Sequence, residues 1–71
     1  MQEEVRNAIA AEFGDAEISI DLDGNRAMIR VVDARFADLN RVKRQQAAYA
    51  CINDFIADGR LHAVTIQAET P

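Results

Sequence analysis

Apolar residues recur at helical spacing in the first part of the chain and predict an amphipathic helix over residues 3–13. Its apolar positions are Val5, Ala8, Ile9 and Phe13. Charged and polar residues occupy the rest of the helical wheel. Gly14 follows the last apolar position, and we expect the helix to end there.

Strict alternation of apolar and polar residues follows, over 17–22 and again over 26–32, and predicts two strands. The inward positions would be Ile18, Ile20 and Leu22 in the first strand and Ala27, Ile29 and Val31 in the second. Asp23-Gly24-Asn25 lies between them and is a strong hairpin signal. We therefore expect the two strands to be antiparallel.

The second half of the chain predicts a connector, a long helix and a last strand. Residues 33–39 would include one short helical turn carrying Phe36 and Leu39, and Asn40 is a plausible N-cap for a helix from Arg41 to about Asp58. The expected buried positions of that helix are Val42, Ala48, Tyr49, Ile52, Phe55 and Ile56. Gly59 ends it, and alternation from about Leu61 to Ala68 predicts the last strand.

The element order is α-β-β-(short α)-α-β, within a single domain over residues 1–71. The long helix can serve as a crossover, so we expect the last two strands to be parallel. The predicted fold class is α+β, a two-layer sandwich in which helices cover one face of a mixed three-stranded sheet.

Composition narrows the class of protein. Of 71 residues, 49% are apolar, which favours a folded domain, and no apolar stretch approaches bilayer length. The acidic N-terminus does not resemble a signal peptide, and a single cysteine fits a reducing compartment, so we expect a soluble, cytoplasmic protein without membrane contact. The net charge of −4 argues against general nucleic-acid coating. A local basic cluster nevertheless comprises Arg35, Arg41, Lys43 and Arg44, with Asp38 as the one acid among them. Either these residues and Arg60 bind nucleic-acid phosphate or an acidic partner, or the cluster is simply a solvated helix start.

Candidate chemistry centres on His62, the only histidine. If the last strand starts near Leu61, His62 shares a core-facing side with Val64, Ile66 and Ala68, at the mouth of the apolar face. It is either a histidine hydrogen-bonded to backbone at a strand start, or one ligand of a metal site completed by another chain. We interpret Cys51 as a packing residue. No nucleophile, acid–base pair, phosphate loop or paired-cysteine motif is present, so we do not expect an enzyme.

Two blocks of sequence resemble the BolA family, closest to its short bacterial IbaG-like branch. One is Phe36-Ala37-Asp38-Leu39-Asn40-Arg41-Val42-Lys43-Arg44-Gln45-Gln46 followed by Tyr49; the other is Gly59-Arg60-Leu61-His62-Ala63-Val64-Thr65-Ile66. Glu69-Thr70-Pro71 also fits, and the element order matches throughout. Asp38 departs from the family's usual glycine.

The resemblance implies a fold like that of a type II KH domain and a non-enzymatic adaptor that binds a monothiol glutaredoxin. It also implies a [2Fe-2S] cluster held only in that complex, with His62 matching the family's histidine ligand. Many members add a His or Cys from the loop between the first two strands. Here that loop is Asp23-Gly24-Asn25-Arg26, and arginine is no iron ligand.

Two other functions stay open. Some relatives bind DNA and regulate transcription through the long helix and the turn before the last strand, where Arg41, Lys43, Arg44 and Arg60 lie here. RNA binding in the KH manner is not expected, because the chain has no Gly-x-x-Gly loop. The domain could also self-associate through an exposed sheet edge, so we expect a monomer or a weak homodimer.

Overall fold

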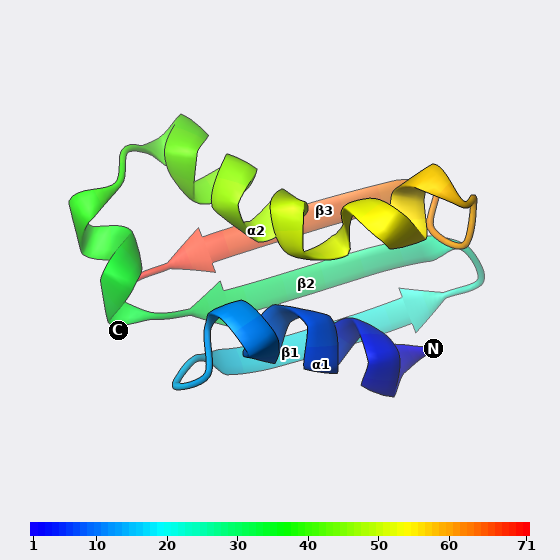
Figure 1. Ribbon diagram of the computed structural model, residues 1–71, viewed down its shortest axis with the longest axis horizontal. Helices are drawn as coiled ribbons and strands as arrows, with labels where there is room; N and C mark the ends of the chain where they lie inside the picture. Colours follow the sequence, from blue (N-terminus) through cyan, green and yellow to red (C-terminus); the bar gives the residue numbers. More distant parts are fainter.

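Two helices, a short 3₁₀ turn and three strands make up the computed structural model, which describes residues 1–71 (Figure 1). In chain order these are α1 (Gln2–Glu12), β1 (Glu17–Asp23), β2 (Arg26–Val32), the 3₁₀ turn (Ala34–Asp38), α2 (Arg41–Ala57) and β3 (Ala63–Glu69). The predicted order of elements and the α+β class are confirmed.

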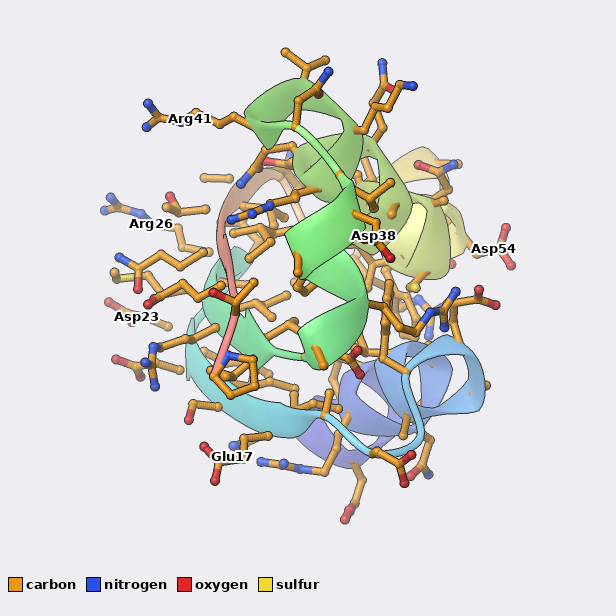
Figure 2. The ribbon with its side chains drawn as sticks, turned by 90° about the vertical axis from the view of Figure 1, so that its left-hand side faces the viewer. Glu17, Asp23, Arg26, Asp38, Arg41 and Asp54 are labelled. Carbon is orange, nitrogen blue, oxygen red and sulfur yellow. The ribbon has the colours of Figure 1, made fainter.

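The sheet has the strand order β1-β2-β3. β1 pairs antiparallel with β2, and β2 pairs parallel with β3, as the hairpin signal and the crossover helix predicted. Both helices lie on one face, with α1 over β1 and α2 along β3 (Figure 1). Figure 2 shows Glu17, Asp23 and Arg26 on the opposite, open face.

Local chemistry explains where the elements begin and turn. Gly24 has a φ of +62°, which places the hairpin turn in the left-handed region that glycine adopts without strain. The side chain of Asn40 accepts a hydrogen bond from the Lys43 backbone N–H at 2.9 Å, so the predicted N-cap of α2 is confirmed. Asp33 caps the 3₁₀ turn in the same way, through Arg35 N–H at 2.7 Å.

The core lies between the helices and the sheet. Its largest fully buried side chains are Phe13, Phe36, Ile9, Ile29, Ile52, Leu61, Val5 and Val31. The rings of Phe13 and Phe36 lie 5.0 Å apart, so the 3₁₀ turn is anchored to the end of α1. The alternation predicted for the strands is confirmed, because Ile20, Ala27 and Ile66 are all buried.

The predicted buried face of α2 is wrong at two positions. Val42 is 64% exposed and Ile56 is 37% exposed, whereas the buried residues are Ala48, Ile52 and Phe55. At 100° per residue, Val42 falls roughly 110° away from the centre of that buried stripe. The side chain of Val42 therefore points to solvent beside the basic residues of the first turn.

The predicted start of β3 is also corrected. The strand begins at Ala63, and residues 58–62 form a closing turn after α2. Gly59 has a φ of +82°, and the Leu61 N–H donates to the Phe55 carbonyl at 3.0 Å, which turns the Leu61 side chain into the core. Because these backbone contacts hold the turn, His62 precedes the strand. Neither helix combines the length and apolar character that a bilayer crossing demands.

Candidate functional site

His62 lies at the end of the molecule where the hairpin turn meets the turn after α2. Its backbone N–H donates to the Asn25 carbonyl at 2.8 Å, and Ala63 N–H reaches the same oxygen at 3.4 Å. Ala63 is also the register partner of Arg26, the first residue of β2. The histidine is therefore fixed by its backbone directly beside the loop that joins β1 to β2.

The His62 side chain is exposed, which corrects the prediction that it would lie at the mouth of the apolar face. The predicted alternative of a side chain bonded to backbone is also wrong, because the imidazole makes no hydrogen bond within the chain. The ring lies near Gly59, because a Cβ added there would be 3.7 Å from Nε2, an ordinary van der Waals distance. The backbone of residue 62 is thus fixed, and its imidazole is open to an external group.

The surroundings of His62 do not form a complete metal site. Nowhere do three His, Cys, Asp or Glu side chains come together as a metal site. The neighbouring loop, residues 23–26, carries neither histidine nor cysteine. A metal or cluster at His62 therefore needs further ligands from a second molecule.

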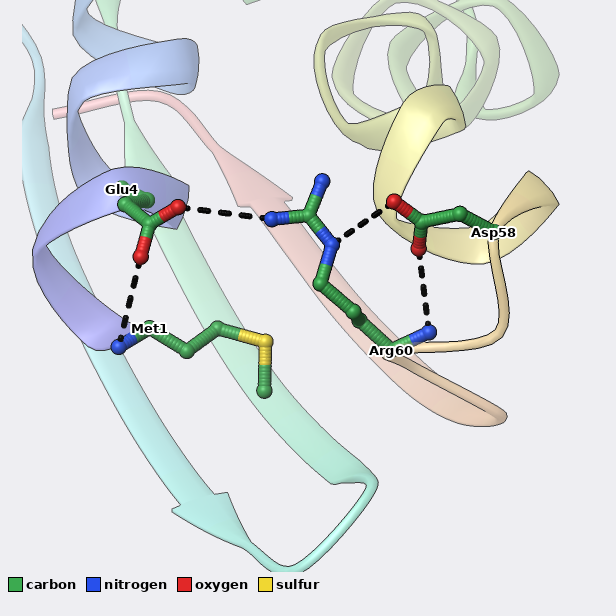
Figure 3. A network of polar contacts seen from close by, with 4 residues as sticks. All are labelled: Met1, Glu4, Asp58 and Arg60. Atoms are coloured by element: carbon green, nitrogen blue, oxygen red, sulfur yellow. Dashed lines mark hydrogen bonds and ion pairs between the residues drawn. The ribbon is translucent and has the colours of Figure 1, made fainter.

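Arg60, two positions before His62, is built into the fold (Figure 3). Its Nε lies 2.8 Å from Asp58 Oδ2, one terminal nitrogen lies 3.3 Å from Glu4 Oε2, and its guanidinium stacks 4.2 Å from the centre of the Phe55 ring. These contacts tie the turn after α2 to the first turn of α1. Of the predicted partner-binding residues, Arg60 is therefore the one that supports the loop of His62.

Arg35 is similarly occupied. It donates to the backbone carbonyl of Glu12 at 2.6 Å and pairs with the Glu12 carboxylate at 3.1 Å, while its guanidinium lies 4.7 Å from the Phe13 ring centre. Its charge is partly neutralised, and its position is fixed at the end of α1. Sequence reasoning grouped it with the basic cluster because it could not foresee the Glu12 partner.

The start of α2 carries basic residues that form no ion pair. Arg41 and Lys43 are exposed and have no carboxylate partner, whereas Arg44 donates through Nε to the Leu39 carbonyl at 2.9 Å. Arg41 points away from the body of the molecule (Figure 2). Since α2 has 17 residues, its two ends are about 24 Å apart. The predicted basic residues therefore do not form one surface, because Arg60 lies at the opposite end.

Cys51 lies in a groove between the two helices. The groove has a volume of about 740 Å³, and Phe13, Leu39 and Ala47 are among its lining residues. Burial, and secondarily the charge of Glu12, raises the pKa of the Cys51 thiol above its usual value. A half-buried thiol with a raised pKa is a poor nucleophile, as expected of a packing residue.

An ion pair on the open sheet face escaped the sequence analysis. Arg30 Nε lies 2.9 Å from Glu69 Oε1, and this contact lowers the pKa of the Glu69 carboxyl, first through the hydrogen bond and then through charge. The alternation of residues in β2 predicts that Arg30 lies on this face. Its pairing with Glu69, however, depends on the parallel register of β2 and β3, which cannot be read from the sequence. The Asn25 carbonyl beside His62 was missed for the same reason.

A family model described as BolA-like protein matches residues 15–71. The chain belongs to the BolA family. It is 41% identical over 68 residues to a protein from the rpoN-murA intergenic region of Acinetobacter guillouiae, covering 96% of this chain and 82% of that relative. It is 35% identical over 68 residues to the acid stress protein IbaG of Escherichia coli K12, covering 96% and 81%.

Solved structures of this family share the fold. BolA1 from Arabidopsis thaliana superposes with a TM-score of 0.86 at 25% identity, covering 97% of this chain and 89% of that one. The BolA domain of SufE1 from the same plant gives a TM-score of 0.84 at 24% identity, covering 97% and 90%. The resemblance and the two-layer fold inferred from sequence are therefore confirmed.

Proposed function

We propose that this BolA-family chain is a non-enzymatic adaptor that binds a monothiol glutaredoxin and offers His62 to a [2Fe-2S] cluster shared between the two proteins. The observation that carries the proposal is the state of His62. Its side chain is exposed and free of hydrogen bonds, while its backbone is fixed to Asn25 at 2.8 Å. A pre-positioned ligand loses little conformational freedom when a partner docks.

Because this chain offers few other ligands, a site shared with a partner protein is favoured over a site formed by this chain alone. A cluster of this kind takes four ligands, and this chain offers a single imidazole, so the remaining positions belong to the partner and to thiols that it brings. A bound cluster would supply one-electron chemistry, and histidine in place of cysteine raises its potential. This chain's own part is to present an imidazole nitrogen and to hold the Asp23–Arg26 turn beside it.

We extend the proposal to a role in iron-sulfur or redox homeostasis under stress. The Escherichia coli relative is named an acid stress protein, and it matches nearly the whole of this chain. Ligand exchange at an imidazole responds to acid, because protonation removes the lone pair that binds metal.

The test mixes the protein anaerobically with a monothiol glutaredoxin, glutathione, iron and sulfide, and follows the visible absorption and circular dichroism. We expect a spectrum distinct from that of the glutaredoxin homodimer. The His62→Ala variant should lose this spectrum, while His62→Cys should restore a bound cluster with thiolate-like bands. Gln67→Ala, on the open sheet face, is the control. An identical spectrum with wild type and His62→Ala would contradict the proposal.

A second candidate function is DNA binding through the start of α2. It is favoured by Arg41 and Lys43, which are exposed and unpaired next to the exposed Val42. Such contacts to phosphate are strongly salt-dependent. Titration of a labelled duplex at two salt concentrations should give weaker binding at high salt, and Arg41→Glu with Lys43→Glu should abolish it. Binding unaffected by this double charge reversal would dismiss the candidate.

A further inference from the structure

The outer edges of the sheet carry an unusual set of side-chain contacts. β1 and β3 are the two outer strands, so each has a row of backbone groups that no neighbouring strand satisfies. Such edges are templates for pairing with another chain, and proteins commonly block them. A helix lies along each of these strands, α1 at β1 and α2 at β3 (Figure 1), and side chains of that helix contact the edge.

At the β1 edge, two side chains of α1 donate to successive outward carbonyls. Gln2 Nε2 lies 3.0 Å from the carbonyl oxygen of Ile20, and a terminal nitrogen of Arg6 lies 2.7 Å from that of Ile18. Four residues along a helix rise about 6 Å, and two residues along a strand rise about 6.8 Å. The two spacings match, so one face of α1 can satisfy alternate carbonyls of a strand beside it.

The β3 edge repeats the arrangement with different residues. Gln45 Nε2 lies 2.7 Å from the carbonyl oxygen of Ile66, and Tyr49 Oη lies 2.8 Å from that of Val64. The donors are again four residues apart on a helix and the acceptors two apart on a strand. Both edges therefore use the same geometry, with a glutamine as the first donor in each helix and different second donors, Arg6 and Tyr49.

We propose that Gln2, Arg6, Gln45 and Tyr49 close both edges of the sheet to strand addition by a second copy of this chain. A new strand would need the carbonyls that these side chains already occupy, and it would need the space beside them. Pairing at either edge would therefore have to compete with two existing hydrogen bonds and displace the side chains that make them. The self-association through a sheet edge that the sequence left open is opposed by these contacts.

The two edges differ in how much they depend on this protection. β1 carries three acids, Glu17, Asp21 and Asp23, and identical acidic strands repel one another. β3, with the sequence Ala-Val-Thr-Ile-Gln-Ala-Glu, has one charge in seven residues and no proline, a composition prone to cross-β pairing. Opening the β3 edge should therefore have the larger effect.

The experiment compares oligomeric state across a wide concentration range by sedimentation equilibrium. Gln45→Met with Tyr49→Phe keeps most of the buried volume and removes both donors at β3; Gln2→Met with Arg6→Met does the same at β1. Gln46→Met, at an exposed position of α2, is the matched control. We expect wild type and control to stay monomeric, and the β3 variant to associate at least about tenfold more tightly than the β1 variant.

A change in association can be distinguished from a loss of folding. Far-ultraviolet circular dichroism establishes whether each variant is folded, and the single change Tyr49→Phe, which removes one hydroxyl, serves if the double variant unfolds. Folded β3 variants that remain monomeric at every concentration would overturn the proposal. So would a wild-type dimer whose intermolecular nuclear Overhauser contacts join Val64 or Ile66 of two copies.

Discussion

His62 and Asn25, from opposite halves of the chain, are joined by a backbone hydrogen bond of 2.8 Å. The bond holds the imidazole-bearing residue against the hairpin turn, next to the point where β2 and β3 start to pair. Any group bound at His62 therefore lies beside residues 23–26. In this chain that loop offers carboxylate, amide and guanidinium groups instead of a second imidazole or thiolate.

The position of residue 26 beside His62 predicts that a substitution there can strengthen retention of a cluster. Replacing Arg26 by His would place a second imidazole next to His62, because Arg26 is the register partner of Ala63. We expect the Arg26→His variant, in the complex with a monothiol glutaredoxin, to lose its cluster several-fold more slowly in the presence of a chelator than wild type does. A second ligand from the same chain adds its binding without a further association cost.

The control for this prediction is Arg26→Gln, which removes the same positive charge without adding a donor. Decay of the visible absorption after addition of chelator measures retention. Equal decay in both variants would show that residue 26 lies outside the reach of a group bound at His62.

The contacts of Arg60 predict that its removal destabilises the fold, although the side chain is exposed. Arg60→Ala removes a cation–π contact with Phe55 and ion pairs with Asp58 and Glu4, so we expect a loss of about 1 kcal/mol in the free energy of unfolding. Arg41→Ala makes the same change of net charge at a residue without partners and should cost close to nothing. Urea denaturation measures both. Amide exchange at His62 should also quicken in Arg60→Ala, and unchanged exchange would contradict its supporting role.

The cap of α2 gives a matched pair of asparagine substitutions. Asn40 caps the helix through Lys43 N–H at 2.9 Å, and Asn40→Ala should lower the free energy of unfolding by about 1 kcal/mol. Asn53 is exposed in the interior of the same helix, where alanine has the higher helix propensity. Thermal and urea unfolding should therefore find Asn53→Ala neutral or slightly more stable than wild type. Equal destabilisation by both substitutions would contradict a stabilising role for the Asn40 cap.

The ion pair of Arg30 and Glu69 predicts a dependence of stability on pH. Arg30 lowers the pKa of Glu69 in the folded state, so the pair stabilises the fold above the unfolded pKa. That contribution is lost as the pH falls through the lowered pKa of Glu69 in the folded state. Arg30→Gln should therefore be slightly less stable than wild type at neutral pH, and the difference should vanish in acid.

Both side chains of this pair are exposed, so the difference should be small and should shrink in high salt. Urea unfolding at several pH values, with Arg41→Gln as the control without a carboxylate partner, tests the prediction. If the stability difference between Arg30→Gln and wild type increased as the pH fell, the pH dependence would have the opposite sign. That result would contradict a lowered pKa of Glu69 in the folded state.

The sequence by itself determined the elements, their order and the inward faces of the strands, because alternation and turn chemistry act over a few neighbouring residues. Asn40 as a cap and Gly24 as a turn could be read in this way. The family, too, followed from two short blocks, residues 36–49 and 59–66, at the expected separation in the chain.

Tertiary structure alone decided which side chains are free. Arg35 and Arg60 look like Arg41 in the sequence, yet the fold brings Glu12 and Glu4 to them and leaves Arg41 without a partner. The exposure of His62 depends on backbone bonds from the turn after α2 and to Asn25 across the sheet. Charge pairing and accessibility are set by residues distant in sequence, so only the packed chain fixes them.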